Sequence, residues 1–316
     1  MSRVLSYITP EMGRLEWLRL RQKGIGGSDA ASIMGMNRWK SPVDIWLSKT
    51  VEIDAAGLEE QSEVAYWGNV LEDVVAKEFA LRTGLKVRKR NAVLQHDEHD
   101  FILANIDREI VGKKIGLECK TASAYKKEEW KDNEIPAEYI IQCQHYMAVT
   151  GYDAWYIACL VGGNTFIYKL IERDDEFIEM LMKSEVEFWN SYVVPNIMPP
   201  VDGSESSSIA LDTLYPTAEK GSEITLSAHE NELLIERRSL VAMKEQCDDR
   251  IKEIDNQIKA AMGESESAVG ANFAVKWSNS SRTTIDSKRL KAELPEIYKE
   301  YANTTNGRRF TIKEID

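Results

Sequence analysis

A glutamate and a lysine lie two residues apart in I-G-L-E-C-K-T-A-S, residues 115–123, which otherwise has the composition of a buried strand. Because side chains alternate faces along a strand, Glu118 and Lys120 share one face and Cys119 lies on the other. Burying two charges costs free energy unless they pair or bind a ligand. An edge strand with one solvated face is the simplest interpretation of an isolated E-x-K, so any chemistry depends on the surrounding residues.

A second carboxylate is expected beside this pair. Asp107 ends the strand predicted at 101–107, and a turn at 111–113 leads back into the strand of Glu118. The two carboxylates are about equally distant from the turn and could face each other across a hairpin. Two carboxylates form a hard oxygen site suited to magnesium. Lys120 could then hold or polarise a water beside the metal, as in metal-assisted phosphodiester hydrolysis.

Further polar groups make this pattern more specific, because a D-x10-E-x-K spacing alone would match many proteins by chance. Glu72 lies in the middle of a strongly periodic predicted helix, on the polar side next to its apolar stripe. Gln142 and Tyr146 share a face of the helix predicted after the strand, and Gln144 is nearby. Core packing explains Tyr146 but gives no reason for two glutamines within an apolar helix.

The elements that must position these residues alternate between helices and strands. Periodicity predicts helices at 16–23, 41–50, 67–84, 136–150 and 174–189, and strands at 86–94, 101–107, 115–121, 155–161 and 165–171. The apolar face of the helix at 67–84 is expected to comprise Val70, Val74, Val75, Phe79 and Ala80. A glycine-rich turn at 24–27 enters a further helix, which Ser28 or Asp29 could cap.

The chain after residue 203 has a different character. S-E-S-S-S begins a linker expected over 204–226. Residues 227–263 predict one long amphipathic helix with a capping box at its start and Gly263 at its end. Packing on its own domain and formation of a coiled-coil arm are both consistent with its imperfect heptads. Residues 264–316 predict a small α+β module.

Composition bounds the class of protein. The chain has 316 residues, 43% hydrophobic and 29% charged, as in a globular protein with one large and one smaller domain. A net charge of −12 argues against a globally basic nucleic-acid binder, yet residues 81–90 hold five basic residues and no acid. No C-x-x-C pair, membrane-spanning run or secretory signal is visible, so a cytoplasmic protein without a membrane partner is expected.

The motifs together resemble a known family. Over residues 14–203 they are W-L-R-L-R-Q-K-G-I-G-G-S-D-A-A-S-I-M-G, W-K-S-P-V-D-I-W, W-G-N-V-L-E, A-N-I-D, L-E-C-K-T-A-S, Q-C-Q-H-Y-M-A-V-T-G and P-P-V-D-G. This order resembles the YqaJ-type viral recombinases, which group with phage lambda exonuclease in the PD-(D/E)XK nuclease superfamily. The resemblance implies an α/β fold of the restriction-endonuclease type over 1–203, with a central mixed sheet flanked by helices. The long helix and the α+β module would be a C-terminal extension.

The resemblance also implies an activity. Family members digest linear duplex DNA from an end, 5′ to 3′, with Mg²⁺ or with Mn²⁺ as a substitute. The remaining single strand serves a single-strand annealing protein of the RecT or beta type in phage recombination. A homo-oligomer, in some members a ring around DNA, and a phage or prophage gene in a bacterial host are implied as well. A non-catalytic DNA-end or partner-binding module and an endonuclease of the same fold are the alternatives.

Site residues follow from the resemblance by position. The implied catalytic residues are Glu72, Asp107, Glu118, Lys120, Gln142 and Gln144. Asp107, Glu118 and the backbone carbonyl of Cys119 would bind the metal, and Lys120 would orient the nucleophile. Glu72 would support the metal and its water, and either glutamine would fix that geometry.

A 5′-phosphate site is implied at the glycine-rich turn. Arg21 and Ser28 match the arginine and serine that flank this turn in lambda exonuclease, and Arg19 is the nearest rival to Arg21. An arginine fork suits phosphate recognition. Arg108 follows Asp107 where the family usually has glycine, and it could contact DNA.

Overall fold

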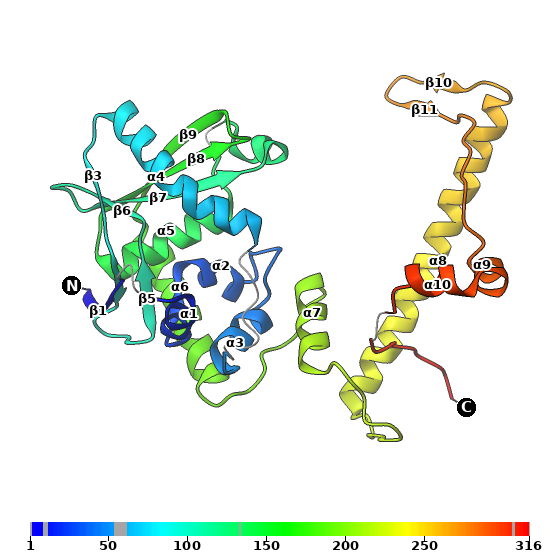
Figure 1. The fold of residues 1–316 in the computed structure, drawn as a ribbon, viewed down its shortest axis with the longest axis horizontal. Helices are drawn as coiled ribbons and strands as arrows, with labels where there is room; N and C mark the ends of the chain where they lie inside the picture. The colour runs from blue at the N-terminus through cyan, green and yellow to red at the C-terminus, as the bar shows by residue number, and fades with distance from the viewer. Residues whose placement is uncertain (1, 9–11, 54–61, 133, 305–306, 316) are drawn as a thin grey trace. The chain divides into compact units, whose positions relative to one another are not determined.

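The computed structural model describes residues 2–8, 12–53, 62–132, 134–304 and 307–315. The chain divides into two compact units, Met1–Tyr215 and Pro216–Asp316. Figure 1 shows the elements of each unit. The first unit contains every residue predicted to act in the site.

The central sheet of the first unit has five strands. Their spatial order is β3 (Val87–Lys89), β6 (Arg108–Ile110), β7 (Ile115–Ala122), β8 (Ala154–Val161) and β9 (Thr165–Glu172). β7 and β8 are parallel, whereas the other neighbouring pairs are antiparallel. A parallel pair needs a crossover connection, which helix α5 (Ala137–Thr150) supplies. The predicted mixed sheet flanked by helices is confirmed.

A second sheet lies beside the first, and two of the predicted strands differ from those in the structure. It has the order β1 (Arg3–Tyr7), β4 (Ala92–Gln95), β5 (Ile102–Asn105) and β2 (Ile25–Gly26). The strand expected at 86–94 is therefore two strands in different sheets, and the strand expected at 101–107 ends at Asn105. Asp107 lies in the connection where the chain passes from β5 to β6. Gly112 adopts φ 79° in the turn before β7.

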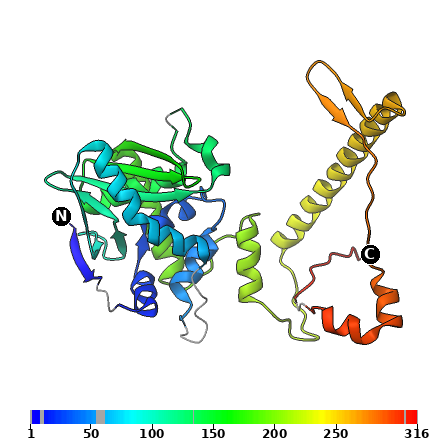
Figure 2. The same ribbon diagram turned by 45° about the horizontal axis from the view of Figure 1, so that its top comes forward.

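Two helices cover opposite faces of the central sheet (Figures 1 and 2). Helix α4 (Glu63–Thr83) packs Val75, Ala76 and Phe79 against Leu117 and Ala158. Helix α5 packs Cys143 and Met147 in the cluster that contains Ile157 and Cys159. Strand alternation therefore directs Leu117 toward α4, and it directs Glu118 to the face that α5 covers.

The apolar stripe expected on α4 is partly wrong. Val70 is 44% exposed and Val74 is 50% exposed, whereas Val75 and Phe79 are buried. The buried stripe instead includes Ala76. Because the exposed Val74 directly precedes the buried Val75, the helix turns a different face to the sheet than the one expected. Gly84 ends the helix with φ 70°, as expected from a left-handed cap.

The remaining helices of the first unit surround the second sheet and α5. They are α1 (Arg14–Gln22), α2 (Gly27–Ile33), α3 (Pro42–Thr50) and α6 (Asp175–Phe188), with a 3₁₀ helix at Ala124–Trp130 and a π-helical turn at Trp189–Val193 after α6. The cap residue of α2 is Gly26 rather than Ser28 or Asp29. Asp29, three residues further, accepts a hydrogen bond from the Gly26 amide at 3.1 Å.

The segment expected as a linker at 204–226 begins with a packed helix, α7 (Glu205–Leu214). Ser204 caps this helix, and Ser206 is buried against Asp44 and the Ser41 amide of α3. Ala210 joins the main hydrophobic core. The serine-rich run therefore starts a helix, and the boundary between the units lies after Tyr215.

The second unit is built on α8 (Ala228–Met262), which spans 35 residues. Ser227 and Glu230 form its capping box, and Gly263 follows its last residue. The other elements are β10 (Ser267–Val269), β11 (Ala274–Lys276), α9 (Ser287–Glu293) and α10 (Pro295–Tyr301). Among the described residues of this unit, Met262 alone is buried. In the described parts of the chain, no helix combines the length and apolar character needed to cross a membrane.

Candidate active site

Asp107 and Glu118 lie next to each other at the start of the paired strands. The register of β6 and β7 pairs Arg108 with Leu117, which places the preceding Asp107 beside Glu118. The Cys119 amide donates a hydrogen bond to Asp107 Oδ2 at 2.8 Å. The side chain of Asp107 therefore lies against β7.

Glu118 is buried and is held on one oxygen only. Lys120 Nζ lies 2.7 Å from Glu118 Oε1, and Gln142 Nε2 donates to the same oxygen at 2.8 Å. Gln142 also donates to the Tyr146 hydroxyl at 2.8 Å. Glu118 Oε2 is buried without a hydrogen-bond partner in the structure. A buried carboxylate oxygen without a partner is costly, so this oxygen is suited to bind a cation.

The electrostatics of the site also favour a cation. Burial raises the pKa of Asp107 well above its usual value, and the nearby carboxylates of Glu118 and Glu72 raise it further. Burial alone would lower the pKa of Lys120, but Glu118 and Asp107 raise it above its usual value. One ammonium thus serves two carboxylates that repel each other. The donor set of two carboxylates and main-chain oxygen fits a hard divalent ion.

The two carboxylates fall short of a full metal cage made of side chains. Among the described residues, no group of three or more His, Cys, Asp or Glu side chains is arranged to hold a metal ion. A site of this kind would need backbone carbonyl or water ligands as well, as magnesium commonly has. The predicted role of the Cys119 carbonyl is of that type and stays a prediction.

Glu72 is close to the pair but faces basic residues. Its Oε1 accepts from Arg108 Nη1 at 2.5 Å and lies 3.6 Å from Lys89 Nζ. The buried guanidinium of Arg108 also contacts Asp73 and the Asp107 carbonyl, the latter at 2.6 Å. Arg108, where the family usually has glycine, therefore holds Glu72 beside the site.

The two predicted glutamines have different surroundings. Gln142 contacts Glu118 directly, as described above. Gln144 Nε2 donates to the Glu172 carbonyl at 2.8 Å, and its Oε1 accepts from the Asp174 amide at 3.1 Å. Gln144 therefore connects α5 to the start of α6 and does not reach the carboxylates.

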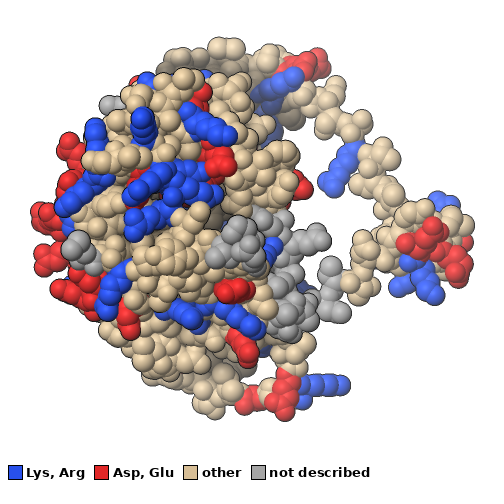
Figure 3. Space-filling model, turned by 60° about the vertical axis from the view of Figure 1, so that its left-hand side comes forward, with Lys and Arg blue, Asp and Glu red and all other residues tan. Residues whose placement is uncertain are grey.

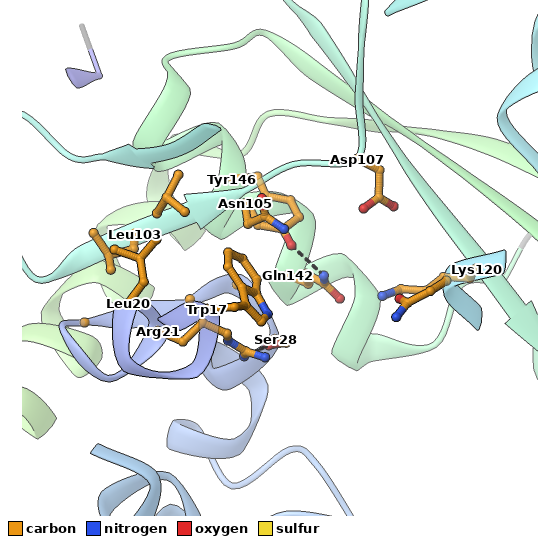
Figure 4. A pocket seen from close by; sticks show the side chains of 15 residues that line it. Trp17, Leu20, Arg21, Ser28, Leu103, Asn105, Asp107, Lys120, Gln142 and Tyr146 are labelled. Atoms are coloured by element: carbon orange, nitrogen blue, oxygen red, sulfur yellow. Dashed lines mark hydrogen bonds between the residues drawn. The ribbon is translucent and has the colours of Figure 1, made fainter. Parts of the chain in front are cut away.

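A cavity of about 290 Å³ extends from Asp107 and Lys120 to the glycine-rich turn (Figure 4). Arg21 and Ser28 line one side, and Asp107 and Lys120 line the other. Arg21 Nη2 donates to Ser28 Oγ at 2.8 Å. Arg19 lies in a different cavity, so the structure brings Arg21 and not its rival to the site.

A buried ion pair supports Arg21 from behind. Asp29 Oδ1 lies 3.4 Å from Arg21 Nη2, and Asp29 Oδ2 lies 2.7 Å from Lys49 Nζ. Burial alone would raise the pKa of Asp29, but Lys49 and Arg21 lower it to about 2. Burial lowers the pKa of Lys49, and the charge of Asp29 offsets part of that shift.

Further cavity residues were not predicted from the sequence, although their spacing carried a signal. Trp17 lies four residues before Arg21 on α1, and Asn69 lies three residues before Glu72 on α4. Such spacings place side chains on one face of a helix. Asn105 lies two residues before Asp107 and also lines the cavity.

An acidic pair and a lysine on adjacent strands of a mixed sheet, covered by helices on both faces, define a PD-(D/E)XK protein. The family model for the YqaJ-like viral recombinase domain matches residues 16–153. The YqaJ protein of Bacillus subtilis (strain 168) is 46% identical over 310 residues, which are 96% of this chain and 96% of that protein. The chain belongs to the YqaJ family.

Solved structures of two exonucleases are also similar to the chain. The alkaline exonuclease LHK-Exo from Laribacter hongkongensis has a TM-score of 0.47 and 20% identity, covering 56% of this chain and 91% of its own. A phage related exonuclease from Haemophilus somnus 129PT has a TM-score of 0.43 and 15% identity, covering 54% of this chain and 96% of its own.

Proposed function

We propose that the chain is a magnesium-dependent exonuclease that degrades one strand of linear duplex DNA, 5′ to 3′, and leaves a 3′ overhang. The observation that carries the proposal is the cavity that Asp107, the neighbour of Glu118, shares with Arg21 and Ser28. An acidic metal site and a basic anion site in one cavity suit a substrate with two neighbouring phosphates. The end of a phosphorylated DNA strand is such a substrate.

Asp107 and Glu118 would hold the metal, with the Cys119 carbonyl as a further ligand. When bound, magnesium would neutralise charge on the phosphoryl oxygens and make a water more acidic. Manganese is expected to substitute, because it takes the same oxygen ligands. The unpartnered Glu118 Oε2 supports this assignment.

The chain's own residues position the reacting groups. Lys120 has three N–H donors, one of which is engaged by Glu118, so it can also donate to a water at the scissile phosphate. Gln142 fixes the orientation of the Glu118 carboxylate. Glu72, held by Arg108, adds negative charge next to Asp107.

The proposed strand polarity rests on the family resemblance, and the position of Arg21 and Ser28 in the same cavity as Asp107 supports it. Arg21 and Ser28 would bind the terminal 5′-phosphate while the next phosphodiester lies at Asp107 and Glu118. A guanidinium and a hydroxyl that already share a hydrogen bond are a suitable pair of phosphate donors. Release of nucleotides from the 5′ end is the expected result.

The second unit is proposed to serve assembly. A single-strand annealing protein of the RecT or beta type would take up the exposed strand, and a homo-oligomer, in the form of a ring, would keep the enzyme on DNA. Helix α8 leaves Leu233, Leu240 and Ile251 between 49% and 57% exposed. Exposed apolar side chains in a row favour contact with a partner or another subunit. We propose the cytoplasm of a bacterial host as the location and a phage or prophage as the source.

Three labelled duplexes test the proposed end recognition. With Mg²⁺, a linear duplex with 5′-phosphates should be digested faster than one with 5′-hydroxyls, and a closed circle should stay intact. Arg21→Gln should remove the preference for the 5′-phosphate, while Arg19→Gln should keep it. Cutting of the circle would indicate an endonuclease instead. An unchanged preference in Arg21→Gln would refute the assigned phosphate site.

A further inference from the structure

A second cavity lies on the other side of Asp107. Its volume is about 430 Å³, and three basic residues line it: Arg14, Lys89 and Arg90. It shares four lining residues with the first cavity, Trp17, Asn69, Asn105 and Asp107. The two cavities therefore adjoin along the connection between β5 and β6, with Asp107 at the boundary.

Two of the three basic residues of this cavity come from a stretch that the proposed reaction leaves unexplained, and Arg14 comes from the start of α1. Lys89 lies at the end of β3, and Arg90 follows it in the run of basic residues at 81–90. Figure 3 shows Lys and Arg side chains gathered on the face that includes the left-hand side of Figure 1, where β1, β3 and β6 lie. The acidic chain therefore has a local basic surface beside its proposed active site.

A buried carboxylate holds Arg90 and the neighbouring Arg88 in place. Glu109 is 3% exposed, and its Oε2 lies 3.2 Å from Arg90 Nη1 while its Oε1 contacts Arg88. Tyr152 also donates to Glu109 Oε2 at 2.8 Å. Two guanidinium groups thus share one carboxylate, so the group keeps a net positive charge. Fixed orientation reduces the entropy lost when these groups bind an anion.

The order of the two cavities indicates what the second one binds. If the terminal phosphate lies at Arg21 and Ser28 and the cut falls at Asp107, the same strand must continue beyond Asp107. The second cavity begins there. Its three basic residues outnumber the acidic Glu72 and Asp107 in the lining. They suit the phosphate backbone, because Lys and Arg contacts to phosphates dominate sequence-independent DNA binding.

We propose that the second cavity binds the phosphates of the cut strand immediately 3′ of the cleavage position. Arg14, Lys89 and Arg90 contact these phosphates, and Glu109 is a positioning residue for Arg90. This subsite rests on the proposed function of the first cavity. Through this subsite the enzyme would stay bound to the strand after each terminal nucleotide leaves.

DNA binding measured in EDTA tests these contacts directly, because EDTA removes the metal and so prevents hydrolysis. The probe is a 5′-phosphorylated duplex, and the variant Arg90→Gln is compared with Lys86→Gln, which removes the same charge outside the cavity. Arg90→Gln should raise the Kd about 10-fold and reduce the slope of log affinity against log salt by about 1. Equal effects of the two variants would overturn the proposal.

Neutral methylphosphonate linkages then identify the strand. One such linkage just 3′ of the cleavage position in the cut strand should weaken binding of the wild-type protein and have no further effect on Arg90→Gln, because the contact is already lost. The same linkage in the uncut strand should affect both proteins alike. Sensitivity confined to the uncut strand would contradict the assignment.

Glu109→Gln tests the positioning role of Glu109, because this role predicts a change in DNA affinity opposite to the one expected from the loss of a negative charge. Removal of an acid normally strengthens DNA binding, but release of Arg90 should weaken it, and the melting temperature shows whether the fold persists. Stronger binding by a folded Glu109→Gln would refute the role of Glu109. The proposed function fails separately, if 5′-phosphorylated and 5′-hydroxyl duplexes are treated alike while Arg90→Gln still weakens binding.

Discussion

Glu118 has an asymmetric environment that suits a ligand more than stability. Oε1 has two donors, Lys120 and Gln142, whereas Oε2 is buried without any in the structure. A second carboxylate, the half-buried Asp107, is adjacent and has a raised pKa. Strain of this kind is kept at functional sites and offset by the rest of the fold. The environment of Glu118 therefore gives the strongest support for a metal-binding role.

The two glutamines of α5 should separate in their effects. Gln142→Ala should lower the turnover number by about 10- to 100-fold, because second-layer contacts to metal ligands typically have this effect. Gln144→Ala should leave turnover unchanged and lower the free energy of unfolding by about 1 kcal/mol, since it loses hydrogen bonds to Glu172 and Asp174. Steady-state digestion rates and urea unfolding of both variants measure this. Reduced turnover in Gln144→Ala alone would contradict the assignment.

Sequence patterns predicted which residues lie together better than they predicted the contacts between those residues. Asp107, Glu118 and Lys120 follow from strand alternation and one turn, which are local. The sequence does not determine which of Gln142 and Gln144 faces Glu118, because that depends on how α5 is rotated against β7. The pairing of Glu72 with Arg108 joins residues 36 positions apart in different elements, so local pattern could not show it.

Helix α5 connects the site to the rest of the first unit. Its His145 is fully buried, with Nδ1 2.7 Å from Glu185 Oε1 on α6 and Nε2 2.8 Å from the Leu103 carbonyl on β5. Both ring nitrogens face acceptors, so the protonated ring satisfies both contacts. Burial alone would lower the pKa of His145, but Glu185 raises it above 6.5.

This raised pKa predicts a pH dependence of stability. The contribution of the His145–Glu185 pair is fully present below about pH 6.5 and is lost as the pH rises through the higher pKa of the folded protein. Glu185→Gln should cost about 1–3 kcal/mol at pH 6 and should flatten this dependence. Urea unfolding at a series of pH values measures both. Parallel curves for the wild-type protein and Glu185→Gln would contradict the prediction.

The approach of α2 to α5 requires a glycine. A Cβ at Gly27 would lie 2.6 Å from a ring carbon of Tyr146, which is too close for the ring to stay in place. Gly27→Ala should therefore lower the free energy of unfolding by about 1–3 kcal/mol. It should also lower turnover, because Tyr146 shares a hydrogen bond with Gln142.

Gly13→Ala is the matched control, since a Cβ there meets nothing within 4 Å. Its unfolding free energy and turnover should both stay near those of the wild-type protein. A Gly27→Ala variant as stable as this control would mean that α2 and α5 pack less closely than the structure indicates.

Element types were predictable from periodicity, whereas their ends and exposed faces depended on tertiary contacts. The strand predicted at 86–94 has the right composition throughout, but its first part pairs with β6 and its second part with β5, so the chain changes sheets between Lys89 and Ala92. Val70 and Val74 fit a helical stripe, yet the rotation of α4 turns the neighbouring face with Val75 to the sheet. Local pattern records which residues can be buried, and the neighbouring elements determine which are.

At the scale of the molecule, the boundary between the units is the clearest difference from the composition. Serine-rich runs usually mark linkers, but Ser204 and Ser206 cap and anchor α7 against α3. The buried Ala210 makes α7 part of the first unit. The second unit, with one buried residue among those described, lacks a core of comparable size.

Two truncations test this boundary. A chain ending at Tyr215 should unfold with the stability of the first unit in the full chain and should still cut DNA, but it should lose assembly through the second unit. A chain ending at Gly203 should lose about 2–4 kcal/mol, because it removes the contacts of Ser206 and the burial of Ala210. Equal stability of the two truncations would contradict the placement of α7.

The central claim is that Asp107, Glu118 and Lys120 form a metal-dependent phosphodiesterase site. Release of acid-soluble nucleotides from a labelled, 5′-phosphorylated linear duplex tests it most directly, with Mg²⁺ or EDTA and with wild-type protein or Glu118→Gln. Nucleotide release is expected only from the wild-type protein with the metal, and circular dichroism should show that both proteins are folded. Equal release by Glu118→Gln, or no release by the wild-type protein with either Mg²⁺ or Mn²⁺, would contradict it.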